Sequence, residues 1–375
     1  MNRGFYLTLM MGGFNASPVP EPVIEALTEV TVSSTVGAQA GFQLKFTLGK
    51  TSAVSRLMAS GFFDPRQRVI IAVTVNGSTE VLMDGIITRQ EVTPSNSPGK
   101  GTLTVTGLDL TALMDFIDLT GIPYPAIPFF LAVDLILAKY LVLGVVPVVI
   151  PPILTLFENP IEKFRKQQGT DYHFVNLMAA AVGAVFYLDP GPKPGMSLAY
   201  WGPDISKLFG TTQPALSINL DASTNLESIN FSYDGTLATQ FFITVIEPIT
   251  KVPIPIPVPS IDLLKAPMAA HAPTALKSKQ IKPAASENIV EAALHALASE
   301  FVTADVISAT GSLDVLRYGH VFKAREVAAV RGAGDYYDGK YYVKSVTHNI
   351  KRGEYKQNFT LSRGGVGSSV STVSV

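Results

Sequence analysis

The sequence predicts a mixed α+β fold that is mainly β, with two β-barrel-like domains and an α/β insertion between them. Short strand-like segments separated by turn residues recur in both halves of the chain, which is typical of small barrels and sandwiches. A helical pattern followed by a further strand, residues 171–188, lies between these two halves. A hairpin pattern at residues 335–363 then closes the second half.

The composition sets the scale and excludes several classes of partner. A chain of 375 residues exceeds one ordinary domain, so two or three domains are expected. Hydrophobic residues make up 47% and charged residues only 16%, which predicts that partners cover part of the surface. A net charge of −1 provides no electrostatic reason to expect nucleic acid or anionic lipid as a partner. The chain contains no cysteine, so disulfides and cysteine-ligated metals are excluded.

The first barrel-like domain is expected at residues 27–118. Residues 1–26 before it are predicted to form an extended N-terminal arm that ends in the proline-broken run 18–22. Asn76-Gly77 is a strong hairpin signal, and a short helix is expected at 109–120. The predicted strands are 26–33, 41–48, 68–76, 80–91 and 101–108.

The α/β insertion, residues 119–210, contains a long apolar segment at 122–157. Its final part, 140–157, carries no charge and reaches the length of a membrane span, but Pro147, Pro151 and Pro152 argue against one because lipid cannot replace the lost helix hydrogen bonds. Three interpretations stay open. A buried core helix followed by a loop is favoured over an exposed patch covered by a partner subunit, and over a membrane span; no stable span is predicted.

Two further helices are expected in the insertion. Residues 158–168 form a short amphipathic pattern. A clearer helix follows, with Asp171 as its cap and Gly183 at its end, and a strand is expected at 184–188. The apolar face of the second helix is predicted to comprise Phe174, Leu177, Met178, Ala181 and Val182.

The second barrel-like domain is expected to be split between residues 211–250 and 302–363. Its first three strands are predicted at 216–220, 226–233 and 239–246. Residues 251–301 interrupt the domain with a polyproline II run at 251–260, a low-complexity linker at 261–285 and a helix at 286–301. Residues 364–375 are expected to be a mobile tail or an edge segment that docks late.

The closing hairpin has the clearest pattern in the sequence. Residues 340–350 are rich in aromatic and β-branched side chains, and residues 351–354 contain the glycine that a turn needs. Residues 355–362 then alternate between packing and polar side chains, as a strand with one buried face does. Because Lys344 and Ser345 interrupt the first strand, a bulge or a polar interface is expected there.

No catalytic or ligand-binding motif stands out, so no catalytic residue, cofactor or metal is predicted. Gly49-Lys50-Thr51 lacks the earlier glycine of a phosphate-binding loop, because position 44 is leucine. Asp109, Asp115 and Asp118 have the spacing of a solvated helix face, and only an acid pair drawn from distant parts of the chain is left open. The histidines are scattered without metal-ligand spacing: His173, His271, His295, His320 and His348.

The C-terminal part of the sequence resembles the closing barrel of the late-control protein D family. The resemblance rests on VAAVRGAG at 327–334, YYDG at 336–339 and YYVKSVTHNIKRGEYKQNFTLSRGG at 341–365. This family comprises the central baseplate hubs of contractile phage tails and phage-tail-like injection systems, together with the hub half of VgrG spike proteins. GFQLKF at 41–46 and GTDYHFVNLMAAAVGAVFYLD at 169–189 are similar to the family's first barrel and to its inserted helix–strand unit.

The resemblance implies a tail-hub fold and a structural, non-enzymatic function. Such a hub is a homotrimeric adaptor that joins the hexameric inner tube to the trimeric spike, because two similar barrels in three subunits present six docking surfaces. The expected partners are a spike protein, an inner tube protein and other baseplate proteins. Because little sequence follows Arg363, the spike is expected to be a separate polypeptide. Assembly is expected in the bacterial cytoplasm, with release of the particle from the cell as a further option.

The hairpin is expected to supply part of the interface. Its basic residues fit either a solvated strand face or the polar rim of a contact with an acidic tube or spike surface. The predicted interface residues are Tyr341, Tyr342, Lys344, His348, Lys351, Arg352, Tyr355, Lys356, Gln357 and Arg363. Two alternatives belong to other classes. One is a secreted or cell-surface β-rich protein that binds glycans or hydrolyses cell walls, and the other inserts residues 122–157 into a membrane.

Overall fold

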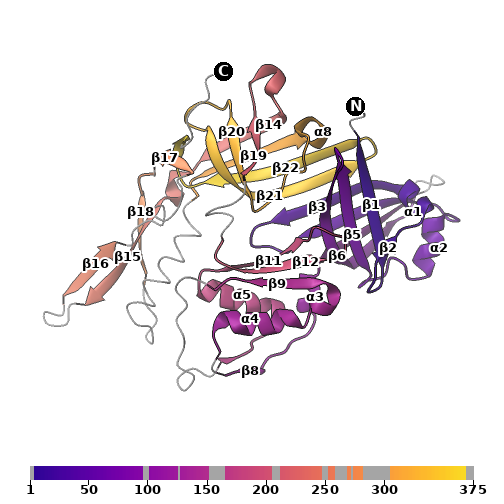
Figure 1. The fold of residues 1–375 in the computed structure, drawn as a ribbon, viewed down its shortest axis with the longest axis horizontal. Helices are drawn as coiled ribbons and strands as arrows, with labels where there is room; N and C mark the ends of the chain where they lie inside the picture. The colour runs from indigo at the N-terminus through magenta and orange to yellow at the C-terminus, as the bar shows by residue number, and fades with distance from the viewer. Residues whose placement is uncertain are drawn as a thin grey trace.

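A 13-stranded sheet dominates the fold (Figure 1). The structure is a computed structural model and describes residues 4–95, 101–125, 127–151, 165–204, 212–246, 252–257, 268–271, 273–281 and 305–368. Eleven strands follow one another in the order β14-β19-β22-β21-β3-β4-β7-β6-β5-β1-β2, and β20 pairs with both β21 and β13. The mainly β, α+β class predicted from the sequence is therefore confirmed.

The N-terminal half of the sheet consists of β1 (Phe5–Gly12), β2 (Ser17–Pro18), β3 (Leu27–Thr35), β4 (Gly41–Leu48), β5 (Arg68–Val75), β6 (Ser78–Thr93) and β7 (Gly101–Asp109). Helices α1 (Glu21–Ala26) and α2 (Ala53–Ala59) lie between these strands along the chain. Asn76 and Gly77 both have positive φ angles, 50° and 85°, and form the predicted turn between β5 and β6.

The prediction of an extended arm at residues 1–26 is wrong for its described part. Strand β1 pairs with β5 along its whole length, and Leu9 and Met11 are buried in the core. Alternation in Phe5–Gly12 is weak because Thr8 is its only polar side chain, so the pattern did not reveal a half-buried strand. The prolines that suggested an arm instead mark β2 and the start of α1.

The C-terminal half consists of β13 (Thr212–Ser217), β14 (Leu226–Tyr233), β19 (Ile307–Asp314), α8 (Val315–Tyr318), β20 (Val327–Arg331), β21 (Gly339–Lys351) and β22 (Glu354–Arg363). Strands β21 and β22 form the predicted hairpin, and their register shifts between Val343 and Ser345, where a bulge was expected. On its other edge β21 pairs with β20 up to Tyr342 and with β3 from Ser345 onward. The β3–β21 pairing joins the strands of both expected barrel domains into one sheet.

The two halves share one topology. The path β3-β4-β7-β6-β5 in the first half matches β14-β19-β22-β21-β20 in the second, and α2 and α8 follow β4 and β19 at equivalent points. The bulges agree too. The register shifts after Leu27 and after Leu226, and again after Ile87 and after Val343. The sixth strand differs, because β1 runs antiparallel to β5 whereas β13 runs parallel to β20. The chain thus contains two copies of a structural unit of five strands and a helix.

One hydrophobic core lies under both halves. Its fully buried members include Leu44 and Phe46 from the first half and Tyr355 and Leu361 from the second. Phe5 of β1 packs against Tyr355 of β22 with ring centroids 5.4 Å apart. The halves therefore fold around shared packing as well as shared hydrogen bonds.

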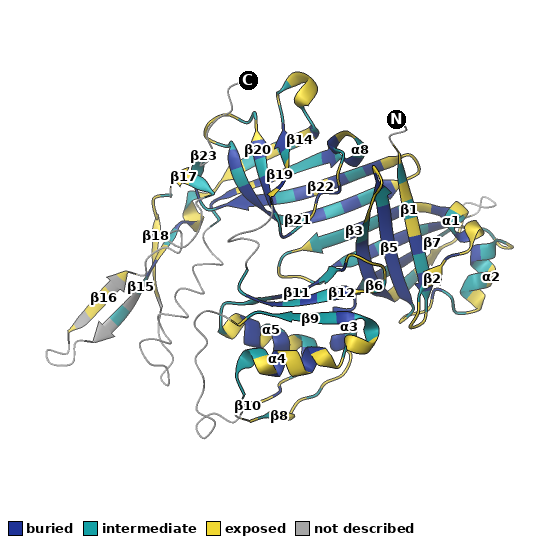
Figure 2. Cartoon of the chain, in the orientation of Figure 1, coloured by how far each residue is buried: buried dark blue, intermediate teal, exposed yellow. Residues whose placement is uncertain are grey.

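The inserted module lies beside the sheet and has its own core. It consists of α3 (Thr111–Met114), β8 (Pro123–Tyr124), α4 (Phe129–Ala138), η1 (Leu141–Leu143), β9 (Val145–Val149), β10 (Arg165–Lys166), α5 (Asp171–Ala181), β11 (Val185–Pro190) and β12 (Ser197–Gly202). Helices α4 and α5 cover the small sheet β11-β12-β9 (Figure 2). Trp201 of β12 is fully buried, and its indole nitrogen donates to the Val175 carbonyl of α5 at 3.3 Å.

Helix α5 and strand β11 appear where they were predicted, with corrections of detail. The cap is Thr170, whose side chain accepts the His173 amide, and not Asp171. The buried residues of α5 include Phe174 and Met178, as expected, whereas Leu177 is exposed. The helix expected at 109–120 shrinks to the four residues of α3. The helix expected at 158–168 lies mostly outside the described residues.

The apolar segment 122–157 becomes helix α4, the turn η1 and strand β9 in its described part. Helix α4 buries Ala132, Val133, Ile136 and Leu137, which agrees with the favoured interpretation of a core helix. Among the helices of the described residues, none combines the length and the apolar character that a membrane crossing requires.

The segment between the two parts of the second half differs most from expectation. Strand β15 (Thr239–Ile246) leaves the main sheet and pairs with β16 (Pro253–Pro257) and β18 (Lys277–Ile281), away from the rest of the molecule in Figure 1. In its described part, the predicted polyproline II run is therefore a strand at the edge of this small sheet. Prolines at every second position of β16 can all face the open edge, where no amide proton is needed. The predicted helix 286–301 lies outside the described residues.

A pair of short strands and two 3-10 turns are further elements of the described chain. Strand β17 (Ala269–His271) pairs with β23 (Val366–Ser368), which gives the start of the predicted tail a place at an edge. The turns η2 (Asp221–Ser223) and η3 (Gly235–Leu237) flank β14. Strands β17 and β18 occupy described parts of the segment that was expected to be a linker.

Candidate functional site

Six of the ten predicted interface residues are buried within this chain. They are Tyr341, Tyr342, His348, Tyr355, Gln357 and Arg363, each at most 5% exposed. The alternation of the hairpin correctly indicated one buried face, and the opposite face is buried as well near the open end of the hairpin, at Tyr342 and Ser362. Burial of these six side chains removes them from the surface that a partner can reach in this fold.

His348, Tyr355 and Gln357 form one buried polar network. The Nδ1 atom of His348 lies 2.8 Å from the Tyr355 hydroxyl and 3.1 Å from Nε2 of Gln357. The Gln357 side chain also accepts a hydrogen bond from the Phe322 amide at 3.0 Å and donates one to the Phe322 carbonyl at 2.7 Å. Burial lowers the pKa of His348 to about 3, so its ring is neutral in the folded chain. The network fixes the hairpin to the backbone at Phe322, which is a structural role.

Arg363 holds the loop before β21. Its guanidinium donates to the carbonyls of Asp338 and Tyr336 at 2.8 and 3.0 Å and lies 4.4 Å from the centre of the Tyr341 ring. Desolvation is the main effect that lowers the pKa of Arg363. A backbone-bound arginine over an aromatic ring stabilises the loop and is not available to an external anion.

The other four predicted interface residues reach the surface, but at separate places. Lys344 pairs with Asp305 at 3.0 Å, Lys351 with Glu29 at 3.5 Å and Lys356 with Glu227 at 2.8 Å. Arg352 donates to the carbonyl of Glu25. All three lysines are partly neutralised within the chain, so they do not form one basic patch.

Arg325 is the residue at which the two halves and the inserted module meet. Its Nη1 donates to Ser34 Oγ at 3.0 Å and to Asp189 Oδ1 at 2.9 Å, and its Nη2 to the Thr35 carbonyl at 3.3 Å. The guanidinium also lies 4.4 Å from the centre of the Tyr187 ring. Desolvation raises the pKa of Asp189, and the charge of Arg325 opposes that shift. One side chain thus fixes β3 and β11 to the start of β20.

A second clamp fixes the inserted module to β5 and β6. Arg68 and Asp84 form a bidentate ion pair with both contacts at 2.7 Å, and the Asp84 side chain is fully buried. The same guanidinium donates to the carbonyls of Leu143 at 2.8 Å and of Gly195 and Phe14 at 3.3 Å. Three loops distant in sequence therefore converge on one arginine.

Sequence reasoning missed both clamps. It gave neither Arg325 nor Arg68 a role. The available signal was positional, because each arginine lies at or just before the start of an apolar strand, where a charged side chain needs a partner if the strand is buried.

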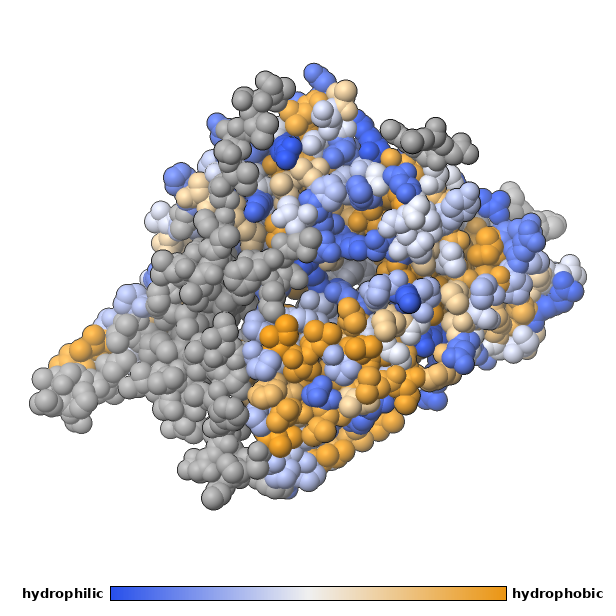
Figure 3. All heavy atoms as spheres, in the orientation of Figure 1, coloured by the Kyte–Doolittle hydropathy of each residue, from blue (hydrophilic) through white to orange (hydrophobic). Residues whose placement is uncertain are grey.

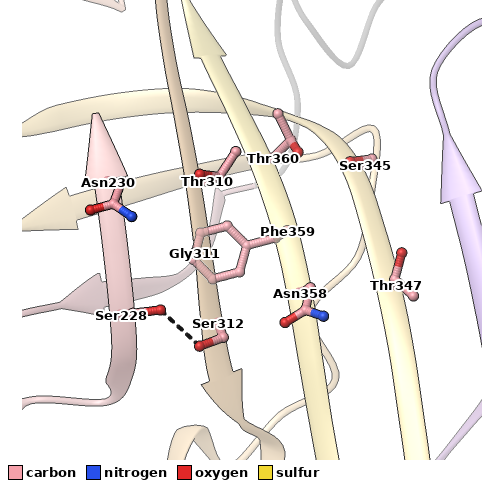
Figure 4. A pocket seen from close by; sticks show the side chains of 10 residues that line it. All are labelled: Ser228, Asn230, Thr310, Gly311, Ser312, Ser345, Thr347, Asn358, Phe359 and Thr360. Carbon is pink, nitrogen blue, oxygen red and sulfur yellow. Dashed lines mark hydrogen bonds between the residues drawn. The ribbon is translucent and has the colours of Figure 1, made fainter. Parts of the chain in front are cut away.

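A polar groove of about 420 Å³ crosses the outer face of the C-terminal half (Figure 4). Ser228 lies opposite Ser312, with their hydroxyls 2.9 Å apart, and Phe359 lies over Gly311, which has no side chain to obstruct it. The groove can offer hydroxyl and amide groups to water or to a polar surface, but it holds no ionised side chain. Its polar lining consists of Ser228, Asn230, Thr310, Ser312, Ser345, Thr347, Asn358 and Thr360.

An apolar surface lies on the inserted module, where hydrophobic side chains gather over α4 (Figure 3). Leu131 and Leu135 are 43% and 59% exposed on the outer side of α4, and Leu141 and Val142 are 52% and 70% exposed in η1. Exposed apolar side chains in such numbers are typical of a contact surface. The segment 122–157 therefore combines a buried helix face with an exposed apolar one.

Within the described residues, no group of three or more His, Asp or Glu side chains is arranged to hold a metal ion. The buried and surface sites above are built from backbone carbonyls, ion pairs and hydroxyl groups. Their common chemical capacity is to fix elements of the chain against one another and to present surfaces for contact.

Comparisons with known proteins extend these observations. No protein-family model and no curated protein matches the sequence. The tail protein from Neisseria meningitidis MC58 matches with a TM-score of 0.61 at 13% identity, over 97% of this chain and 98% of that one. The 43 kDa tail protein of prophage MuSo2 from Shewanella oneidensis matches with a TM-score of 0.62 at 12% identity, over 96% and 99%.

A chain of the Francisella PdpA–VgrG complex matches with a TM-score of 0.63 at 10% identity, over 99% of this chain and 60% of that one. At such identities the likeness shows the fold. The chain has the fold shared by phage tail proteins and VgrG, so the resemblance seen in the sequence is confirmed at the level of fold.

Proposed function

We propose that this chain is the structural central hub of the baseplate of a contractile injection system or phage tail. In this proposal it is a homotrimeric adaptor that joins the hexameric inner tube to the trimeric spike. The observation that carries the proposal is the structural repeat, in which β3-β4-β7-β6-β5 and β14-β19-β22-β21-β20 have the same order and the same bulges. The shared fold of tail proteins and VgrG supports it.

The repeat offers a physical solution to a symmetry mismatch. Three copies of a chain with two equivalent halves present six similar surfaces to a sixfold ring, while the whole chain keeps threefold symmetry toward the spike. The β3–β21 pairing and the Arg325 contacts hold the halves in a fixed relation, which a load-carrying adaptor needs.

In this proposal the hub acts through contacts and catalyses no reaction. Its partners are two further copies of itself, a spike protein, an inner tube protein and other baseplate proteins. The apolar α4 surface suits a contact with one of these proteins, because an exposed apolar patch of this kind is normally covered in an assembly. Assembly takes place in the bacterial cytoplasm, and the finished particle is able to leave the cell.

Co-expression with the tube and spike proteins of the parent particle tests the proposal. A tag on this chain should recover both partners, and native mass spectrometry should count three copies of this chain in the complex. A variant that replaces Leu135 and Val142, which are exposed, with serine should leave the monomer folded but reduce recovery of the protein that contacts this apolar surface. Recovery of the tagged chain alone, as a soluble monomer that joins no tube or spike protein, would contradict the proposal.

A further inference from the structure

We propose that the inserted module binds an α-helix of another baseplate protein on the outer side of helices α4 and α5. The partner helix is amphipathic, and it carries one lysine or arginine within its apolar stripe. This inference rests on the proposed function and names the kind of partner that the apolar α4 surface fits. It concerns the inserted module and not the strands of the main sheet.

Helix α4 is apolar on both of its sides. Its sequence, FFLAVDLILA, contains Asp134 as its only polar residue. One side packs into the core of the module, and the other side leaves Leu131 and Leu135 exposed at 43% and 59%. A helix that is hydrophobic all round is typically buried all round, whereas a surface helix has a polar outer face. A further layer of protein is therefore expected on the outer side of α4.

The apolar surface extends beyond α4 in two directions. In η1, which follows α4 along the chain, Leu141 and Val142 are 52% and 70% exposed. In α5, Leu177 is 43% exposed, and Ala180 and Ala181 are exposed one turn farther along the helix. Figure 3 shows hydrophobic side chains gathered over this part of the module. The contact area thus includes both helices.

Helices α4 and α5 lie side by side in Figure 1. The Nζ atom of Lys139, at the end of α4, lies 2.5 Å from the carboxylate of Asp171, at the start of α5, so the two helices run in opposite directions. Adjacent helices present ridges and grooves, and a third helix packs into such grooves at an axis separation of about 8–10 Å. The exposed side chains of Ala138 and Ala180 are small, which permits a close approach.

A helix fits this surface better than a strand does. Both α4 and α5 use their backbone amides and carbonyls in their own helical hydrogen bonds, so a strand cannot pair with them. The contact must instead be made by side chains, as when an amphipathic helix lies in an apolar groove. The ten residues of α4 span about 15 Å, which matches about three turns of a partner helix.

Asp134 specifies a charge in the partner. It is exposed between Leu131 and Leu135 in the sequence of α4, and no described residue forms a hydrogen bond or an ion pair with its side chain. The next charged residue along the chain, Lys139, is already paired with Asp171. A carboxylate that a partner removes from water is costly unless it gains a basic or donor group. The partner helix is therefore expected to place a lysine or arginine against Asp134.

The same carboxylate disfavours two other occupants. Helices that lie on a membrane carry lysine and arginine on their polar side, whereas the only charge of α4 itself is negative. A twofold contact between the α4 surfaces of two copies of this chain would bury Asp134 of each copy near the other, and like charges at a contact are unfavourable. A different protein with a basic residue avoids both problems.

Photocrosslinking in the assembled particle tests the inference. The photoreactive residue p-benzoylphenylalanine replaces Leu131, Leu135 or Leu177 in separate variants, and mass spectrometry identifies the crosslinked residues after irradiation of the purified particle. All three positions should crosslink to one segment of one other baseplate protein, at residues that are three, four or seven apart. That spacing indicates a helix, whereas a strand would give residues two apart.

Leu237 in η3 provides a matched control position, because it is 48% exposed and lies outside the inserted module. The photoreactive residue at this position should not crosslink to the same segment. Crosslinks from α4 to another copy of this chain or to lipid would overturn the inference, and so would the absence of any crosslink from α4. In particles that contain this chain with tube and spike proteins, these results leave the hub proposal standing. A chain that is found in no particle would overturn both.

A charge exchange tests the role of Asp134. In the variant with the photoreactive residue at position 135, Asp134→Lys should lower the crosslink yield by about tenfold, because it places like charges together. Replacement of the basic residue of the partner segment by glutamate should restore the yield. Asp134→Glu keeps the charge and serves as the control. An unchanged crosslink yield in Asp134→Lys, with an unchanged thermal midpoint of the chain, would contradict a basic residue opposite Asp134.

Discussion

Arg66 and Arg325 occupy equivalent positions in the two halves, and both have positive φ angles, 75° and 64°. Each donates its backbone amide at 2.8 Å to the residue that precedes a bulge, Ile87 in one half and Val343 in the other. The Arg325 side chain is buried between the halves, whereas Arg66 lies at the surface near the Phe116 ring. The same local backbone therefore carries a buried arginine between the halves at one site and an exposed arginine at the other.

This pair provides a matched test of the Arg325 clamp. Arg325→Ala should lower the free energy of unfolding by roughly 1–3 kcal/mol, because it removes the hydrogen bonds to Ser34 and Thr35 of β3 and the ion pair with Asp189, whose side chain is 42% exposed. Arg66→Ala imposes the same left-handed backbone on alanine at an exposed site, so it serves as the control for that cost. Urea unfolding measures both. A loss no greater for Arg325→Ala than for Arg66→Ala would contradict the clamp.

The Arg68–Asp84 pair should be essential for the placement of the inserted module. Asp84→Asn leaves the buried Arg68 charge without its partner and should cost roughly 3–5 kcal/mol, since a buried pair broken on one side is strongly destabilising. Hydrogen exchange should rise first at residues 143–145 and 195–197, which bond to Arg68 or lie next to it. Unchanged exchange at these residues in the variant would show that the pair does not hold the module.

His348 should make folding sensitive to acid. Its folded pKa of about 3 lies below the ordinary 6.5, so the unfolded chain binds more protons between these values. The free energy of unfolding therefore falls as pH drops from 6.5 toward 3, by up to about 1.4 kcal/mol per pH unit from this group. His348→Gln should flatten that dependence, and His320→Gln, at an exposed site, should leave it unchanged. Parallel pH profiles of wild type and His348→Gln would refute this role.

Gly311 should resist substitution because Phe359 and the backbone of β14 fill the space of a side chain. A Cβ atom there would lie 2.5 Å from the Ser228 carbonyl oxygen and 2.6 Å from the Phe359 ring. Gly311→Ala should cost about 1–3 kcal/mol as an overpacking change. Gly13→Ala, where no atom lies within 4 Å, is the control. Equal thermal midpoints for the two variants would contradict this account of the groove floor.

Much of the fold could be predicted from local patterns. The hairpin, helix α5, strand β14 and the bulge near Lys344 follow from alternation, from helical spacing and from turn residues, which are properties of neighbouring residues. The apolar segment was harder, and its favoured interpretation as a buried core helix agrees with α4, which packs one face into the core of the inserted module.

The errors arise where distant partners decide the structure. Strand β1 gains its place from β5, which lies far from it along the chain, and nothing local in Phe5–Gly12 reveals that pairing. The proline-rich run becomes β16 because β15 offers it an edge, which composition alone does not show.

The burial of six predicted interface residues has a related cause. The local sequence pattern around a polar or aromatic residue of a strand is the same whether its side chain contacts water, a partner or another part of the same chain. His348 and Gln357 face a buried network, and Arg363 faces the loop 336–338. Only the three-dimensional arrangement separates these cases.

Electron cryomicroscopy of the assembled particle tests the central claim most directly. The account predicts three copies of this chain in a closed ring between tube and spike, with the two halves of each chain related by about one sixth of a turn and in similar density. A ring with another number of copies, or halves that occupy dissimilar positions relative to the tube, would contradict it.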